Sequence, residues 1–145
     1  MGALKKASIT SMLAAGLSLQ WPGASFPQSF DGQYRAVLNC AKLPFTDVPL
    51  DNEPVDVKIS NGNVSYSRTL YGANRSTVVG KETGIGTVAA DGTIALTGGW
   101  KGRRDSVKAS YGGKLSGGET RLSGKHIVIY QGRSYDRGCT LTVKK

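Results

Sequence analysis

The stretch VDVKISNGNVSYSRTL, residues 55–70, carries the clearest structural signal in this chain of 145 residues. Asn-Gly is a preferred dipeptide for a two-residue β-hairpin turn, and here it separates two segments in which apolar and polar residues alternate. A turn at Asn61-Gly62 places the apolar residues of both segments on one face. The expected cross-strand pairs are Ile59 with Val64 and Val57 with Tyr66.

Two more glycine turns extend the pattern along the chain. In IGTVAADGTIALTGG, residues 85–99, a two-residue turn at Asp91-Gly92 pairs Ala89 with Ile94 and leaves Val88 on the other face. A turn at Gly117-Gly118 brings one further set of apolar residues into phase, namely Val107, Ala109, Tyr111, Leu115 and Leu122. In KHIVIYQG, residues 125–132, the alternation is lost, and this strand is expected to be buried on both faces.

The chain therefore belongs to the all-β class, as an antiparallel up-and-down meander of about eight strands. Eight antiparallel strands are enough to close a small β-barrel in which the last strand pairs with the first. A sandwich of two stacked sheets is the alternative that hairpin order does not separate from a barrel. The expected strands are 30–40, 55–61, 63–71, 76–90, 93–101, 105–116, 119–131 and 136–144.

The chain has two cysteines, Cys40 and Cys139, and each falls on the apolar face of a terminal strand. We predict one disulfide that joins strands one and eight, with both sulfurs buried and Cα atoms about 4.4–6.8 Å apart in neighbouring strands. The spacing does not fit a zinc site, because the only nitrogen ligand on offer is His126. We expect no metal and no cofactor.

Residues 1–25 have the pattern of a signal peptide: Lys5 and Lys6 precede an apolar run that ends near Leu19. That run is too short for a membrane span, which takes roughly 20 residues. We therefore expect a single β-barrel domain over residues 26–145, without stable membrane insertion, in the periplasm or secreted. A retained membrane-associated helix is the alternative. An oxidising compartment agrees with the predicted disulfide.

The net charge is +9, and it is unevenly distributed. Residues 25–57 hold two basic and five acidic side chains, whereas residues 58–145 hold fifteen basic and five acidic ones. This charge favours anionic partners. Nucleic acid is a poor choice of partner, because an exported protein rarely meets it and the chain has no recognition motif.

Groups for catalysis are few. The single histidine, His126, is needed for any Ser-His-Asp or Cys-His arrangement, and an ordinary strand histidine explains it better. A carboxylate pair for glycoside cleavage has to come from scattered residues such as Asp31, Asp105 and Asp136. We expect that the protein is not an enzyme.

Two stretches combine aromatic and basic residues, and in an up-and-down barrel both lie at the same end. The first is GGWKGRRDS, residues 98–106, and the second is YQGRSYDRG, residues 130–138. Such side chains stack on rings and pair with anions; a solvated hairpin loop around one packed tryptophan is the simpler interpretation. The candidate ligand-binding residues are Trp100, Lys101, Arg103, Arg104, Arg133, Tyr135 and Arg137.

The segment AKLPFTDVPLDNEP, residues 41–54, interrupts the strand pattern with three prolines and is predicted to be a long loop. It is either a functional loop or a lid that packs apolar side chains over an open barrel end. The apolar side chains of such a lid are Leu43, Phe45, Val48 and Leu50.

The segments FDGQYRAVLNC, GTVAADGTIALTGG and RGCTLTV resemble a group of small, uncharacterised exported bacterial β-rich proteins with a cysteine in the last strand. The resemblance implies no activity. In architecture alone the chain is similar to the avidin-type barrel, whose cavity is lined by several tryptophans. Only Trp100 remains after signal removal, so biotin binding does not carry over.

The leading functional hypothesis is a non-enzymatic extracytoplasmic binding protein that recognises an anionic envelope component, a small molecule or a protein through its basic and aromatic loops. The alternatives are a structural envelope protein without a small ligand, an exported hydrolase inhibitor and, last, a hydrolase. A cavity inside the barrel favours ligand carriage, whereas a filled interior favours a structural role.

Overall fold

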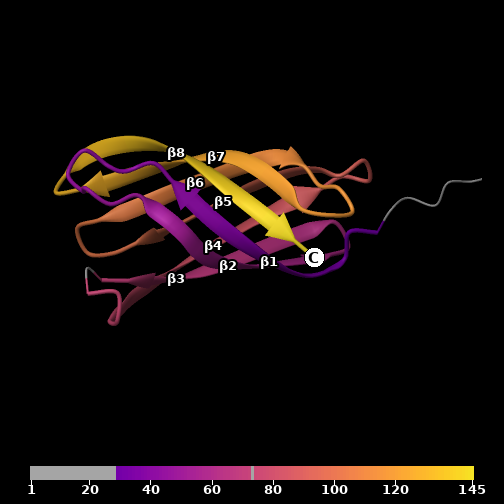
Figure 1. The fold of residues 1–145 in the computed structure, drawn as a ribbon, viewed down its shortest axis with the longest axis horizontal. Helices are drawn as coiled ribbons and strands as arrows, with labels where there is room; N and C mark the ends of the chain where they lie inside the picture. The colour runs from indigo at the N-terminus through magenta and orange to yellow at the C-terminus, as the bar shows by residue number, and fades with distance from the viewer. Residues whose placement is uncertain (1–28, 73) are drawn as a thin grey trace, which may run out of the picture.

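The structure, a computed structural model, describes residues 29–72 and 74–145. The described chain forms one closed antiparallel barrel in which each strand pairs with the next and β8 pairs with β1 (Figure 1). This confirms the all-β meander and the closed barrel, and the sandwich is excluded. The strands are β1 (Gly32–Cys40), β2 (Leu50–Ser60), β3 (Asn63–Tyr71), β4 (Val78–Val88), β5 (Thr93–Lys101), β6 (Ser106–Lys114), β7 (Thr120–Tyr130) and β8 (Arg133–Lys144).

The Asn61-Gly62 hairpin forms as predicted. Both residues have positive φ, 50° and 75°, which is the type I′ geometry that matches the twist of the flanking strands. The predicted pairs, Val57 with Tyr66 and Ile59 with Val64, are present in the β2–β3 ladder, and all four side chains are buried.

The predicted register at Asp91-Gly92 is wrong by one residue. Val88, rather than Ala89, pairs with Ile94, so that Val88 joins the buried face. The cause is a longer turn: Gly92 has a φ of +90°, and the amide of Ala89 donates to the carbonyl of Thr93 across a loop of three residues, 90–92. Such a loop, with glycine in the left-handed region, is the next most common hairpin type.

Strand β2 begins earlier than predicted. It includes Pro54, which pairs with Val37 of β1. The β2–β3 ladder begins only at Asp56, so Pro54 has a strand neighbour on one side alone, where proline is tolerated. A bulge at Asn52, whose φ is 53°, then shifts the β1–β2 register and brings half-buried Leu50 opposite Cys40.

Strand β8 also begins earlier than predicted, at Arg133, because Gln131 and Gly132 form a second tight turn with positive φ. The prediction that strand β7 is buried on both faces is wrong, because buried and partly exposed residues alternate over residues 126–129. His126 and Val128 are buried inside the barrel, while Ile127 and Ile129 are half-buried on the outer face.

The predicted disulfide is present. Cys40 and Cys139 are directly opposite one another in the β1–β8 ladder, and both are buried. Their Cα atoms lie 4.1 Å apart, slightly below the expected range, because close approach is typical of a non-hydrogen-bonded antiparallel pair. A disulfide is compatible with an oxidising, extracytoplasmic location.

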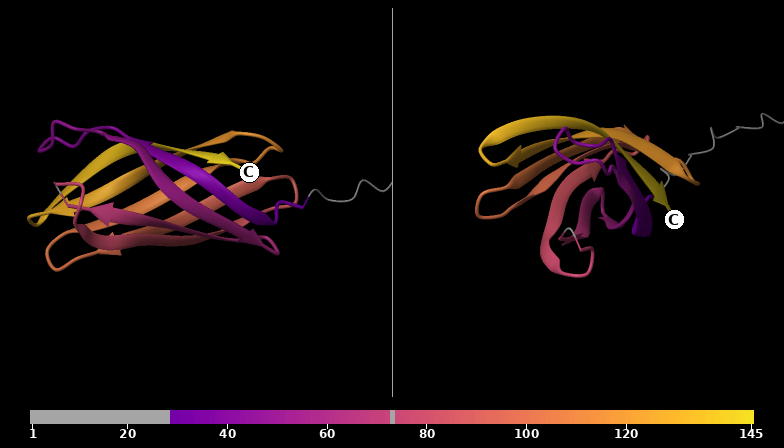
Figure 2. Two further views of the ribbon diagram at one scale, coloured as in Figure 1. Left: turned by 60° about the horizontal axis from the view of Figure 1, so that its bottom comes forward. Right: turned by 60° about the vertical axis from the view of Figure 1, so that its left-hand side comes forward.

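The barrel has two different ends. Both the C-terminus and the start of β1 lie at one end, together with the turns after β2, β4 and β6 (Figures 1 and 2). At the other end lie loop 41–49, the connection after β3, and the turns after β5 and β7. We call this second end the polar end, because of the side chains described below. The proposed signal peptide, residues 1–25, lies outside the described residues, which hold no helix with the length and hydropathy of a membrane span.

Candidate functional site

Charged and polar side chains occupy the interior of the polar end, where a barrel of this size ordinarily holds apolar ones. The buried members are Glu53, Arg68, Glu82 and His126, and half-buried Arg137 lies beside them. Burying a charge is costly unless it is paired and hydrogen-bonded. The contacts of these residues therefore show which of their charges and hydrogen-bond donors have a protein partner and which do not.

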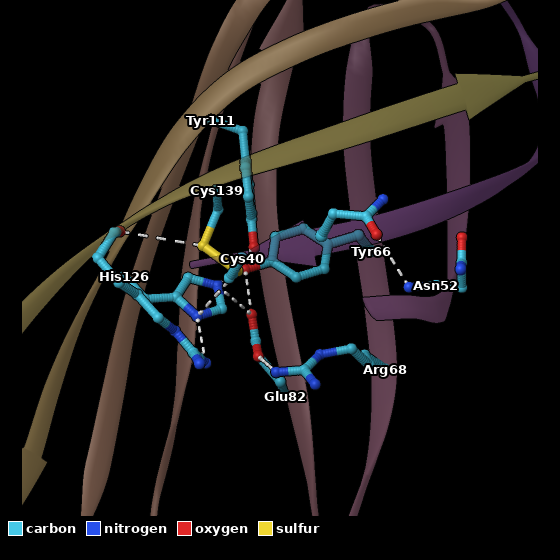
Figure 3. The surroundings of a disulfide bond; sticks show 10 residues. Cys40, Asn52, Tyr66, Arg68, Glu82, Tyr111, His126 and Cys139 are labelled. Atoms are coloured by element: carbon cyan, nitrogen blue, oxygen red, sulfur yellow. Dashed lines mark hydrogen bonds and ion pairs between the residues drawn. A yellow bond between two sulfur atoms is a disulfide. The ribbon is translucent and has the colours of Figure 1, made fainter. Parts of the chain in front are cut away.

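Arg68 of β3 and Glu82 of β4 are directly opposite one another in the ladder and form a buried ion pair. Arg68 Nη2 donates to Glu82 Oε2 at 2.5 Å, and the hydroxyl of Tyr66 donates to the other carboxylate oxygen at 3.2 Å (Figure 3). Burial, with Glu82 as the second cause, raises the pKa of Tyr66 above its ordinary value, so its hydroxyl stays protonated. The charge of Glu82 is thus matched by Arg68.

His126 of β7 is fully buried between Tyr111 and Arg137. Arg137 Nη2 lies 3.3 Å from Nδ1, and the hydroxyl oxygen of Tyr111 lies 2.7 Å from Nε2. Since a guanidinium only donates, Nδ1 must accept, and the proton of the neutral ring is on Nε2, which donates to Tyr111. This assigns the tautomer from the bonding partners.

The imidazole is neutral at physiological pH. Burial is the main reason that the pKa of His126 falls to about 4; Glu82 opposes the shift, while Arg137 and Arg68 add to it. Although Glu82 Oε1 lies 3.9 Å from Nε2, a neutral ring makes no ion pair with it. Arg137 is therefore not neutralised by the histidine that it contacts.

A cavity of about 250 Å³ opens beside these groups. Its charged lining consists of Arg68, Arg137 and the pair formed by buried Glu53 and exposed Arg75. The other lining residues are Leu50, Leu70, Tyr71, Gly72, Val79, Trp100 and Val107. The volume is slightly below the roughly 300–1,000 Å³ of pockets that hold drug-sized ligands, which indicates a small ligand.

Both arginines of this cavity keep unused donors. Nε of Arg68 and Nε of Arg137 are buried and have no hydrogen-bond partner among the described residues. Leaving a buried donor unpaired costs about 1–3 kcal/mol, so such atoms call for an explanation. Within the same described residues, Arg137 bonds no carboxylate, whereas Arg68 and Arg75 each do. The cavity therefore carries one uncompensated positive charge.

Trp100 forms an apolar wall of the cavity, and two glycines make room for it. A Cβ atom at Gly80 of β4 would lie 2.1 Å from the indole Nε1, and one at Gly102 would lie 2.6 Å from Cη2. The indole thus packs closely against the backbone at both positions, which fixes it at the end of the barrel.

Of the seven candidate ligand-binding residues predicted from the sequence, the structure places two in the cavity lining and five outside it. Trp100 and Arg137 meet in the cavity, while Tyr135 contacts Phe45 in an edge-to-face geometry outside the cavity lining. The other four, Lys101, Arg103, Arg104 and Arg133, are exposed and do not line the cavity.

Loop 41–49 packs in part as a lid does. Leu43 is buried, and Phe45 stacks on Tyr130 with ring centroids 4.4 Å apart. Val48 is 68% exposed and does not take part. Leu50, expected as part of this loop, instead belongs to β2 and packs against the core.

Sequence reasoning missed Arg68, Glu82 and His126 as members of the site. A signal was present, because each lies in the inward phase of its strand: Arg68 follows Val64 and Tyr66 at intervals of two. A charged residue at an inward position is the pattern that identifies such a site.

His126 also lies beside the disulfide, 3.8 Å from the Cys40 sulfur. The two sulfurs and one histidine nitrogen lie within 4.8 Å of one another, the spacing of a metal site. Because thiolates bind metals and these sulfurs are bonded to each other, the group is not a metal-binding set in the oxidised protein.

A hollow of about 590 Å³ is lined by the cations Arg35, Lys144 and Lys145, but all three are exposed and remain hydrated. Two other hollows that are larger than the candidate cavity have one charged lining residue each among the described residues. One, of about 430 Å³, lies between loop 41–49 and β8, and Asp51 is its single charged lining residue. The other, of about 610 Å³, lies over β2–β5, and its one charged lining residue among those described is Lys58. Neither is lined by Arg68 or Arg137, which carry the unpaired buried donors.

The cavity at the polar end is therefore the candidate site, with Arg68, Arg137 and Trp100 as its principal residues. No protein-family model, curated protein sequence or solved structure matches the chain.

Proposed function

We propose that this protein is a non-enzymatic, extracytoplasmic binding protein that holds a small anion in the cavity at the polar end of its barrel. One observation carries the proposal: two arginines line the same cavity, and each has a buried Nε–H group without a protein acceptor. Guanidinium groups are suited to anions because their N–H groups form a planar fork that fits carboxylate and phosphate oxygens.

The rigidity of the scaffold supports binding. Arg68 lies on β3, which pairs with β4, and Arg137 lies on β8, which pairs with β7. Nη2 of Arg68 donates to Glu82, and Nη2 of Arg137 donates to His126. Side chains fixed in this way lose little conformational entropy when a ligand binds, which favours affinity. His126 serves in this proposal to position Arg137, because it is fully buried and does not line the cavity.

The location belongs to the same proposal. The signal-like residues 1–25 and the buried disulfide both support a periplasmic or secreted protein. The excess of positive charge over residues 58–145 adds long-range attraction for anions.

The test is a titration of the purified, oxidised protein with small anions, in which NMR monitors the arginine Nε–H signals. The probes are four sodium salts: acetate, benzoate, phenyl phosphate and benzenesulfonate. We expect at least one anion to shift the signals of Arg68 and Arg137 together, since both line one cavity.

Arg137→Gln should weaken that binding about tenfold or more, as loss of a charge-assisted contact does. The matched control is Arg133→Gln, which removes the same charge from an exposed position of the same strand. The proposal fails if none of the four anions shifts these signals, or if both variants bind as the unchanged protein does.

A further inference from the structure

The chemistry of the cavity narrows the class of anion, a step that rests on the proposed function. The charge of the cavity favours a ligand with a single negative charge. Glu82 is paired with Arg68 and Glu53 with Arg75, so that among the described cations of the cavity lining Arg137 is the one without a counter-charge. One negative charge compensates it. A second negative charge would lie close to Glu53 and Glu82 without a cation to match it, and the low dielectric of the interior strengthens that repulsion.

The cavity lining has an ionic part and an apolar part. Apart from the ionic groups, the lining is dominated by apolar side chains, which are Leu50, Leu70, Val79, Trp100 and Val107. An inorganic anion leaves these walls in contact with water. A ligand with an apolar body removes that water, and an indole surface favours a ring that stacks on it or meets it edge to face.

The hydrogen-bond donors of the two arginines favour a carboxylate. Arg68 and Arg137 each donate to the protein through Nη2 and have a buried Nε–H without an acceptor. A carboxylate has two oxygens with about four lone-pair sites, so one carboxylate can accept from two guanidiniums at once. Two donors and one surplus charge match this group.

We propose that the ligand is a small monocarboxylic acid with a compact aromatic or other apolar body, bound as its anion. Its carboxylate lies between Arg68 and Arg137, and its body contacts Trp100 and Val107. The cavity of about 250 Å³ limits the body to about one ring.

The experiment compares matched probes at pH 7.5, again with the Arg68 and Arg137 Nε–H signals as the readout. Benzoate has the proposed charge and ring. Benzamide retains the ring without the charge, acetate retains the charge without the ring, and phenyl phosphate carries mostly two charges, since its second pKa is about 6. We expect benzoate to bind at least about tenfold more tightly than each of the other three.

Two further arms test the details. At pH 5, where phenyl phosphate is mainly a monoanion, its affinity should rise toward that of benzoate while His126 remains mostly neutral. Trp100→Leu should weaken benzoate several-fold more than acetate, because it removes the ring contact alone. Tyr135→Leu, at a position outside the cavity lining, is the matched aromatic control, and melting curves verify that both variants fold.

The outcomes separate the two proposals. If phenyl phosphate at pH 7.5 binds more tightly than benzoate and shifts the same arginine signals, the monocarboxylate class is wrong and anion binding stands. If benzamide binds as tightly as benzoate, the ligand needs no charge and the proposal is wrong on that point. If acetate binds as tightly as benzoate, the ligand needs no apolar body. If no anion shifts either signal, both the class and the binding function fall.

Discussion

At the scale of single residues, His126 makes the stability of the barrel depend on pH. Its pKa is about 4 in the folded protein, against an ordinary value of 6.5, mainly because burial disfavours the charged ring. A lowered pKa means that the unfolded chain takes up a proton first as the pH falls. Stability is therefore complete above about pH 6.5 and is lost progressively toward pH 4.

We expect urea unfolding to show about 2–3 kcal/mol less stability at pH 4.5 than at pH 7.5, because one pKa unit corresponds to about 1.4 kcal/mol. His126→Gln retains a polar side chain and does not titrate, so its stability should vary less over this range. Carboxylates contribute equally to both proteins and cancel in the comparison. Parallel pH curves for the two proteins would contradict the role given to His126.

The residue scale is also where the sequence is least informative about the site. Trp100 and Arg137 were identified from their aromatic and basic neighbours, yet four of those neighbours are exposed. Local composition reports which charges are close along the chain. It does not report that Arg68 and Glu82 face one another across the β3–β4 ladder, or that His126 of β7 joins them once the sheet curls into a barrel.

At the scale of strands, glycines in β4 adapt the wall of the barrel to the side chains inside it. A Cβ atom at Gly84 would lie 2.0 Å from Tyr66 Cε1 and 2.6 Å from the backbone oxygen of Thr97. Tyr66 has little freedom to move, because its hydroxyl donates to the buried Glu82. Gly84 is therefore needed both for packing and for the buried ion pair.

Gly84→Ala should lower the free energy of unfolding by about 1–3 kcal/mol, the usual cost of overpacking, and should weaken anion binding through Tyr66 and Glu82. Gly138→Ala in β8 is the matched control, since a Cβ atom there meets nothing within 4 Å. That change should be neutral or should stabilise by about 0.4–1 kcal/mol. Urea denaturation of both variants measures the difference; equal stabilities would refute the packing argument.

Strand boundaries were predictable where the turn chemistry was unambiguous. Asn61-Gly62 gave the correct register because both positions accept positive φ easily. Asp91-Gly92 gave a register one residue off, since the same dipeptide also fits a three-residue loop with glycine in the left-handed region. Gln131-Gly132 was missed because glutamine rarely begins such a turn.

At the scale of the whole molecule, closure was predictable because the inward phase of the first and last strands agrees at their cysteines. The ladder of β1 with β8 extends from Arg35 opposite Lys144 to Cys40 opposite Cys139. Closure then creates the site: it places Arg137 of β8 inside the same cavity as Arg68 of β3. The cavity itself was not predictable, because its volume depends on how side chains from six strands pack.

The last prediction concerns the disulfide that locks this closure. Cys40 and Cys139 are 99 residues apart, so the bond restricts most of the unfolded chain, and the chain-entropy model gives about 4–5 kcal/mol of stabilisation. Reduction should thus lower the free energy of unfolding by up to that amount. The reduced barrel should remain folded, because six residue pairs still join β1 to β8. The free energy of unfolding of the reduced protein should depend more steeply on urea, since a chain without the crosslink exposes more surface on unfolding.

Urea denaturation with and without reductant measures both quantities, and the double variant Cys40→Ala and Cys139→Ala, which reductant leaves unchanged, is the control. A loss below about 1 kcal/mol would show that strand pairing alone maintains the closure, and that the bond adds little to the fold it joins.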